Sequence, residues 1–533
     1  MSQKQLSILV FISGLSVMAV EMTGLRLLAP YFGTSLIVTT VLIGSMMGFL
    51  SLGYSLGGKY GDRNPTLKAL CKITMAASGC ILLIPLIGRP ILKMAASTLQ
   101  PLLMGGTLEQ PEVAFASIVS GMIGTLVLFA VPVTLMGMVS PWAIRLSVSE
   151  VESSGKAAGK LYALSTFGSI LGSFLPAIVL IPNLGVKYTF FFIGFILMLP
   201  SAWGYFSNKI VSTSLPVALF GLSFLLPSFA IRPADGVIHE SESLYHFIQV
   251  AEEPYGKCEN ARHLYLNEGI AVHSVKCPDD TIELAGYWAM MTTSPMFIDN
   301  LENFDSALVI GLAGGTMAKG MLDIYPDVKV DGVEIDGDVI EIGKKYFDNA
   351  HPNINPIVMD GRIFLQMTKK KYDIIQIDAY RQPYIPFHLV TQEFFQEVHD
   401  HLEDDGVLAI NVASVRGIST DLTAMIYRTI REVFPWVITI KATRSNEIII
   451  ASKKPELNDV DFSSLENPAK SPRIKNALKR LKKRDDYKNN RYLQSYLSRT
   501  KLDVPNWKEA TLLSDDYAPV EMAWDLMTLE FVK

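Results

Sequence analysis

The 533-residue sequence has little cysteine and little histidine, with 4 of the first and 8 of the second. Four cysteines are too few for a disulfide-rich secreted module, and the histidines lack the Cys/His spacing that is typical of a metal site. We therefore predict no bound metal. With 47 Lys and Arg against 52 Asp and Glu, the chain also lacks the basic excess of a nucleic-acid-binding protein, so we expect no nucleic-acid partner.

Charged residues are scarce in the first 230 residues and common afterwards. The first stretch holds 13 Lys and Arg and 6 Asp and Glu, a net charge of +7, whereas the remaining 303 residues hold 34 and 46, a net charge of −12. The whole chain is 49% hydrophobic and only 19% charged, which excludes a single soluble globule. The contrast predicts a membrane domain over residues 1–230 that is followed by an acidic soluble part.

Seven apolar stretches of about 20 residues predict a multi-pass domain in the cell (plasma or inner) membrane, with the lipid bilayer as a partner. They cover residues 6–30, 36–55, 70–87, 114–138, 161–181, 188–206 and 212–230. Lys and Arg gather around the loops after the second and fourth stretches, which places these loops and the N-terminus in the cytoplasm. An odd number of spans then puts the soluble part outside, and an even number returns it to the cytoplasm.

The soluble part begins with short strands and continues with an alternation of strands and helices. Strands over 245–251, 262–266 and 271–276 predict a small antiparallel β subdomain over 235–290. Buried strands over 306–311, 328–335, 354–359, 372–378 and 406–412 alternate with helical stretches. This pattern predicts a doubly wound, Rossmann-like α/β domain over 291–533 that binds a nucleoside.

A glycine loop and two carboxylates follow the first two predicted parallel strands. Gly311, Gly314 and Gly315 lie between a strand and a helix, where the backbone and the helix N-terminus can approach a ligand. Glu334 and Asp336 end the next strand about 20 residues further on, where a carboxylate can accept hydrogen bonds from both ribose hydroxyls. The usual Gly-x-Gly-x-x-Gly spacing is absent, which disfavours a phosphate-binding dinucleotide fold.

The third and fourth strands end in carboxylates as well. Asp360 is followed by Gly361, and its side chain could accept a hydrogen bond from an adenine amino group. Asp378 ends the fourth strand, next to the reactive end of a bound nucleoside. An acidic residue at this strand end either takes part in the chemistry or only positions the cofactor.

These motifs resemble the spermidine synthase (polyamine aminopropyltransferase) family, in the subgroup where a membrane domain precedes the synthase-like domain. The resemblance is carried by residues 242–247, 311–316, 333–336, 360–361, 372–378 and 391–394, and by 26–33 and 513–521 for the fused subgroup. In that family decarboxylated S-adenosylmethionine donates an aminopropyl group to an amine, on the fold of S-adenosylmethionine methyltransferases. The resemblance implies that Glu334 binds the ribose, Asp360 the adenine, and that Asp378 accepts the proton of the attacking amine.

Several positions around the amine depart from the family pattern. Soluble synthases have an acidic residue where this chain has Gly314, and a second aspartate where it has Arg381. Each such exchange near a charged amine is worth about 1 to 4 kcal/mol, which argues against putrescine as the acceptor. Since a guanidinium pairs well with carboxylate or phosphate, the acceptor is either a small amine or an anionic molecule. The resemblance lines the substrate pocket with Tyr245, His246, Tyr287, Tyr380 and Arg381.

The two cysteines of the small sheet help to predict on which side of the membrane the soluble part lies. Cys258 and Cys277 flank a predicted hairpin, so a disulfide between them is feasible, and two unpaired thiols are an equal alternative. A disulfide and the loop charges would both place the soluble part outside, which we slightly favour. The cytosolic origin of an adenosyl donor argues for the opposite side.

The sequence therefore predicts a membrane-bound transferase that moves an aminopropyl group from decarboxylated S-adenosylmethionine to an amine. Two alternatives stay open. One is a methyltransferase that uses S-adenosylmethionine itself, and the other is a non-catalytic nucleoside-binding module that serves sensing or transport. Whether two copies form a homodimer is also open.

Overall fold

The computed structural model describes residues 3–32, 36–97, 112–148, 154–206, 209–225, 236–255, 258–267, 271–277, 287–298, 301–380, 385–413, 420–443, 446–455, 504 and 506–520. The chain forms two compact units. The first comprises Met1–Gly105, Val113–Ala234 and Glu240–Phe247, and the second comprises Gly106–Glu112, Asp235–His239 and Ile248–Lys533.

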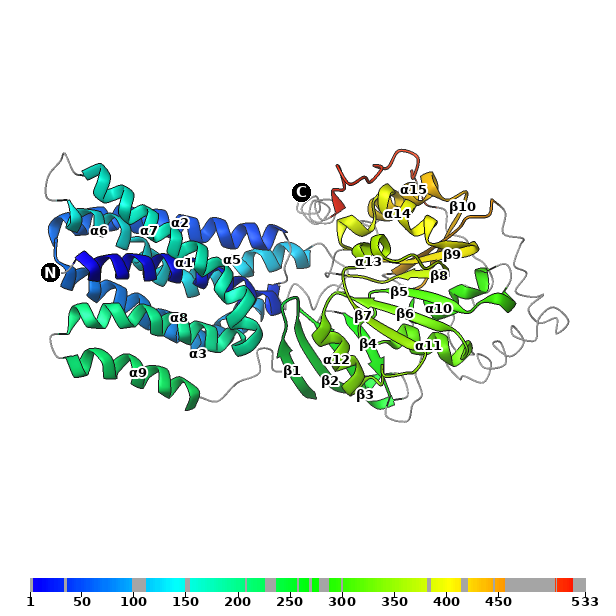
Figure 1. Ribbon diagram of the computed structural model, residues 1–533, viewed down its shortest axis with the longest axis horizontal. Helices are drawn as coiled ribbons and strands as arrows, with labels where there is room; N and C mark the ends of the chain where they lie inside the picture. Colours follow the sequence, from blue (N-terminus) through cyan, green and yellow to red (C-terminus); the bar gives the residue numbers. More distant parts are fainter. Residues whose placement is uncertain are drawn as a thin grey trace. The chain divides into compact units, whose positions relative to one another are not determined.

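The first unit is a bundle of apolar helices that run side by side (Figure 1). They are α1 (Gln3–Phe32), α2 (Leu36–Arg63), α3 (Leu67–Ser97), α5 (Glu112–Gly137), α6 (Val139–Ser147), α7 (Ser154–Leu175), α8 (Ile181–Tyr205) and α9 (Lys209–Leu225), with a π-helical turn over Pro176–Leu180 between α7 and α8. Helix α1 packs closely on α7, since a Cβ at Gly168 or Gly172 would collide with the backbone carbonyls of Phe11 and Leu15.

Five helices in the described part of the chain are long and apolar enough to cross a membrane, whereas the sequence predicts seven spans. The fifth and sixth expected spans merge into one apolar stretch, Gly155–Tyr205, in which Gly185 has a left-handed φ of 74°. The seventh expected span is α9, which has only 17 residues. These helices suggest a multi-pass membrane protein.

The second unit contains the main sheet of seven strands in the order β10-β11-β9-β8-β5-β6-β7. The strands are β5 (Ser306–Ile310), β6 (Lys329–Glu334), β7 (Ile354–Val358), β8 (Tyr372–Ile377), β9 (Leu402–Ala413), β10 (Trp436–Lys441) and β11 (Asn446–Ser452). Strands β5 to β9 are parallel, as predicted, whereas β10 and β11 add an unpredicted antiparallel hairpin at one edge. The chain moves outwards from β5 in one direction and from β8 in the other, and open α/β sheets bind their ligands at the carboxyl ends of the strands beside such a switch point.

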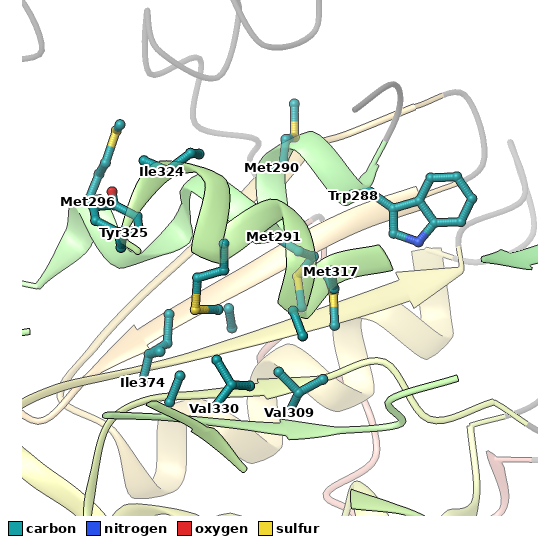
Figure 2. Close-up of a cluster of buried hydrophobic side chains, with 14 of the residues drawn as sticks. Trp288, Met290, Met291, Met296, Val309, Met317, Ile324, Tyr325, Val330 and Ile374 are labelled. Carbon is teal, nitrogen blue, oxygen red and sulfur yellow. The ribbon is translucent and has the colours of Figure 1, made fainter. Parts of the chain in front are cut away.

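Helices cover both faces of this sheet, which explains why the central strands β5 and β8 are mostly apolar. They are α10 (Tyr287–Thr293), α11 (Thr316–Ile324), α12 (Gly337–Tyr346), α13 (Gly361–Met367), α14 (Gln392–Asp400) and α15 (Thr420–Val433). Figure 2 shows one face, where Met291 and Met317 pack over Val309 and Val330. The Rossmann-like α/β architecture is thereby confirmed.

A small four-stranded sheet, in the order β1-β2-β3-β4, confirms the predicted antiparallel subdomain and adds one strand to it. Its strands are β1 (Val237–Glu242), β2 (Phe247–Tyr255), β3 (Cys258–Leu266) and β4 (Val272–Lys276). No disulfide joins the two described cysteines Cys258 and Cys277. Arg262 pairs with Lys276, so Cys277 lies opposite Ala261, three residues along β3 from Cys258.

Candidate active site

The glycine loop joins the ends of three strands of the main sheet. The amide of Gly311 donates to the carbonyl of Val333 at the end of β6 (2.9 Å), and the amide of Asp378 donates to the carbonyl of Ile310 at the end of β5 (2.9 Å). Gly311 has a φ of 90°, and a Cβ there would collide with the backbone of Asp378. The loop ends at Gly315, the N-cap of α11, so a helix N-terminus lies next to the glycine loop.

Glu334 is fixed against this loop from the end of β6. Its carboxylate accepts hydrogen bonds from the amides of Ala313 (2.9 Å) and Asp336 (3.3 Å) and is largely buried. Asp336 caps α12 by accepting from the amide of Asp338 (3.1 Å). The structure thus gives Asp336 a capping role, and its contact with a donor stays a prediction.

Ser274 of β4 occupies the space beside Gly314, where soluble synthases have an acidic side chain. The amide of Gly314 donates to the Ser274 hydroxyl (2.8 Å). A Cβ at position 314 would lie 2.8 Å from the Ser274 Cβ, closer than such atoms approach. The small sheet therefore keeps this part of the glycine loop uncharged.

Asp360, at the end of β7, caps α13. Its Oδ1 accepts from the amides of Arg362 (2.9 Å) and Ile363 (3.1 Å), and its Oδ2 lies 2.9 Å from His388 Nε2. The hydrogen bond with His388 is the main cause that lowers the pKa of Asp360 below its usual range. The next residue, Gly361, packs against the Ile310 side chain. The predicted adenine ligand is therefore an ionised carboxylate.

Arg362 connects this corner to the late segment around residue 515. Its guanidinium forms ion pairs with Glu397 (3.0 Å) and Asp515 (2.6 Å), and the Thr391 hydroxyl donates to Asp515 (2.8 Å). The motif over 513–521 carried part of the resemblance, but its partners could not be inferred from the sequence.

Asp378, just beyond the end of β8, accepts hydrogen bonds from uncharged groups. Asn411 Nδ2 of β9 donates to its Oδ1 (2.9 Å), and the Tyr287 side chain donates to the same carboxylate. The Tyr380 hydroxyl donates to the carbonyl of Asn411 (2.7 Å) and accepts from the amide of Ala413 (2.7 Å). The structure thus brings three predicted site residues, Tyr287, Asp378 and Tyr380, together and adds Asn411.

The pKa of Asp378 differs from that of an ordinary aspartate. Burial raises it to about 6, although the hydrogen bonds from Asn411 and Tyr287 lower it. Burial, with the neighbouring Asp378 charge, also raises the pKa values of Tyr287 and Tyr380 well above 10, so both hydroxyls keep their protons. At neutral pH this cluster holds one carboxylate that can accept a proton.

Three predicted pocket residues are not placed with this cluster. Tyr245 and His246 belong to the first unit, so their part in the pocket stays a prediction. Arg381 lies outside the described residues. Within the described residues, no group of three or more His, Cys, Asp or Glu is arranged to hold a metal ion.

The main sheet lies within a match to a known family. Residues 284–464 match the family model of the spermine/spermidine synthase domain. The C-terminal part of this chain carries a spermidine synthase-family domain. The family uses decarboxylated S-adenosylmethionine as its donor.

Three relatives of the synthase-family domain show the extent of the similarity. A probable polyamine aminopropyl transferase of Bifidobacterium longum is 29% identical over 317 residues, 58% of this chain and 66% of that protein. A polyamine aminopropyltransferase of Vibrio vulnificus is 33% identical over 204 residues, 37% of this chain and 66% of that protein. The crystal structure of spermidine synthase from Thermotoga maritima is 24% identical, with a TM-score of 0.36, over 44% of this chain and 79% of that one. The chain thus spans 66% of the length of each of these two curated relatives.

Proposed function

We propose that this protein is a membrane-bound aminopropyltransferase that moves the aminopropyl group of decarboxylated S-adenosylmethionine to the amine of a small acceptor. The observation that carries the proposal is the partly buried Asp378, which has a pKa of about 6 and lies at the same sheet edge as the glycine loop. A general base works best when its pKa is close to the working pH.

In the proposed reaction, Asp378 takes a proton from the acceptor ammonium. The freed amine nitrogen attacks the propyl carbon that is bonded to the donor sulfur. The new C–N bond forms while the C–S bond breaks, so the sulfonium becomes the neutral thioether of methylthioadenosine and the positive charge moves to the new ammonium. Glu334 and Asp360 would hold the ribose and the adenine.

The test is a product assay on the purified full-length protein in detergent. Decarboxylated S-adenosylmethionine is incubated with putrescine, longer polyamines, monoamines and amino acids, and methylthioadenosine and the alkylated amine are both quantified by mass spectrometry. We expect equal amounts of the two products with at least one amine. Binding of methylthioadenosine without turnover of any amine would favour the non-catalytic binding module instead.

Methyl transfer is the second candidate, because the loop beside Gly314 is uncharged. S-adenosylmethionine carries a carboxylate that the decarboxylated donor lacks, and an acidic loop residue would repel that carboxylate. With Ser274 in this place, the site offers no such repulsion from the loop. The same assay with S-adenosylmethionine distinguishes the two reactions, since methyl transfer releases S-adenosylhomocysteine.

We further propose that the soluble domain lies on the side of the membrane opposite the basic loops. At one end of the helix bundle, Arg145 pairs with Asp62 (3.0 Å). The Glu240–Phe247 segment of the first unit contacts the other end, where Arg26 donates to the carbonyl of Tyr245 (3.2 Å) and Val186 donates to Glu242 (2.6 Å). Because basic loops stay in the cytoplasm, the chain would enter the soluble part on the external side.

Labelling of single cysteines in intact cells tests this placement. In a variant without native cysteines, Asp404→Cys reports the soluble domain and Lys156→Cys reports the basic side; both positions are exposed. We expect an impermeant maleimide to label position 404 in intact cells and position 156 only after lysis. The reverse pattern would place the soluble domain in the cytoplasm, next to the source of the donor.

A further inference from the structure

A row of hydrogen-bonded side chains leads from the edge of the main sheet to Asp378. The Thr443 hydroxyl donates to Asn446 Oδ1 (3.0 Å), Asn446 Nδ2 donates to Asn411 Oδ1 (3.0 Å), and Asn411 Nδ2 donates to Asp378 Oδ1 (2.9 Å). Asn446 is the first residue of β11, and Asn411 lies near the end of β9. The two strands are neighbours in the sheet and pair in antiparallel register. The row therefore depends on the added hairpin of β10 and β11.

The ionised carboxylate fixes the direction of this row. Because a carboxylate only accepts hydrogen bonds, Asn411 must turn its NH2 group towards Asp378 and its oxygen towards Asn446. Asn446 must then present its own NH2 group to Asn411 and its oxygen to the Thr443 hydroxyl. Each amide thus holds the next in the orientation that supports the charged form of Asp378.

The Asn411 amide is buried, so it is costly unless its hydrogen bonds are made. Asn411 is only 2% exposed and lies between Ile410 and Val412, which are fully buried. A buried amide costs about 1 to 3 kcal/mol of stability when its hydrogen bonds are missing. An apolar side chain at this position of β9 would carry no such cost. The backbone ladder already joins β9 to β11, so the side chains are not needed to pair the strands.

We propose that Asn411 and Asn446 are positioning residues that keep Asp378 ionised and oriented for proton transfer. The proposal rests on the proposed function, since it assigns these amides to the reaction of Asp378. Neither residue needs to touch the substrate. Thr443 anchors the outer end of the row.

The experiment compares pH profiles of Asn411→Leu, Asn446→Leu and the wild type in the full-length protein. Asn411→Leu removes the hydrogen bond that favours the carboxylate, so the acidic limb of kcat should move up by about one pH unit. That shift is about a fivefold loss of kcat at pH 6 and almost none at pH 8. Asn446→Leu should shift the limb in the same direction by a smaller amount, because Asn411 remains but is no longer held. KM for the donor should not change.

Thr439→Val is the matched control. The Thr439 hydroxyl is buried in the neighbouring strand β10 and has no hydrogen-bond partner among the described residues, so its removal should leave the profile in place. A loss of kcat that is equal at all pH values, or an unchanged limb in both Asn variants, would overturn the proposal. If Asn411→Leu does not fold, Asn446→Leu at the start of β11 still decides the matter.

An infrared titration separates this proposal from the proposed function. The carboxyl band that Asp378→Asn removes reports protonation of Asp378 whether or not the protein turns over a substrate. Its midpoint should rise by about one pH unit in Asn411→Leu. If no amine is alkylated, the proposed function fails. An unmoved infrared midpoint would instead show that the amides do not act on Asp378.

Discussion

The two halves of the main sheet's carboxyl edge shift the pKa values of their aspartates in opposite directions. In the half formed by β6 and β7, Glu334 accepts from backbone amides, and Asp360 accepts from backbone amides and lies beside His388, which lowers the pKa of Asp360. In the half formed by β8 and β9, burial raises the pKa of Asp378 to about 6. Carboxylates with such different environments usually have different tasks. The difference agrees with the proposed reaction, in which one half binds the donor and the other half moves a proton.

The largest effect is expected from Asp378→Asn. The substitution keeps the size of the side chain but removes the base, so kcat should fall about a thousandfold while the affinity for methylthioadenosine stays within about twofold. Product formation and calorimetry measure the two quantities. Asp404→Asn, an exposed aspartate on β9, is the control and should have no effect. Equal losses of binding and turnover would remove the distinction between the halves.

The complementary change is Glu334→Gln. An amide accepts less strongly than a carboxylate from the Ala313 amide and from ribose hydroxyls, so methylthioadenosine should bind about tenfold to a hundredfold more weakly. Calorimetry measures this loss, and kcat at saturating donor should change little. Glu341→Gln, at an exposed position on α12, serves as the matched control. A lower kcat without weaker binding of methylthioadenosine would show that Glu334 takes part in proton transfer and not in donor binding.

Asp378 should also make stability depend on pH. Its folded pKa of about 6 lies above the ordinary value, so the folded state binds the proton more tightly than the unfolded state. The resulting stabilisation is present below pH 4 and is lost as the pH rises through 6. Asp378→Asn should therefore stabilise the protein by about 1 to 3 kcal/mol at pH 8 and by nothing at pH 4. Thermal unfolding of the wild type and the variant in detergent at the two pH values measures this change in stability and its direction.

The smallest effect is expected from His388→Ala in the other half. The lowered pKa of Asp360 stabilises the protein above the ordinary aspartate pKa, and this contribution is lost as the pH falls through the folded value. Because the pair is partly exposed, its loss should cost about 0.5 to 1 kcal/mol at pH 6. Thermal unfolding measures the cost. A stabilised variant at pH 6 would contradict the ionised state of Asp360.

Much of the donor half could be predicted because its residues follow strand ends directly. Glu334 and Asp360 stand where apolar strands stop, and parallel strands bring such positions to one edge. The partners could not be predicted in the same way. Asn411 and Asn446 are 35 residues apart and meet only through the β9–β11 register, and a strand that is buried on both faces gives no sequence sign of its direction.

The helix bundle shows a similar limit. Apolar stretches were recognised from composition, and Gly185, which has a positive φ, lies between the fifth and sixth expected stretches. The number of spans depends on whether Gly155–Tyr205 is counted as one stretch or is divided at this glycine. Ser274 is a comparable case in the second unit. Nothing local to the strand β4 indicates that its hydroxyl meets the glycine loop 40 residues later.

The contact between Ser274 and Gly314 also limits how this site can change. A single substitution that gives the loop an acidic side chain would collide with the serine, and loss of the serine alone would leave the Gly314 amide without its acceptor. An acidic side chain at position 314 therefore requires two changes, one in the glycine loop and one in β4, and either change is harmful by itself. The two positions are thus constrained to change together.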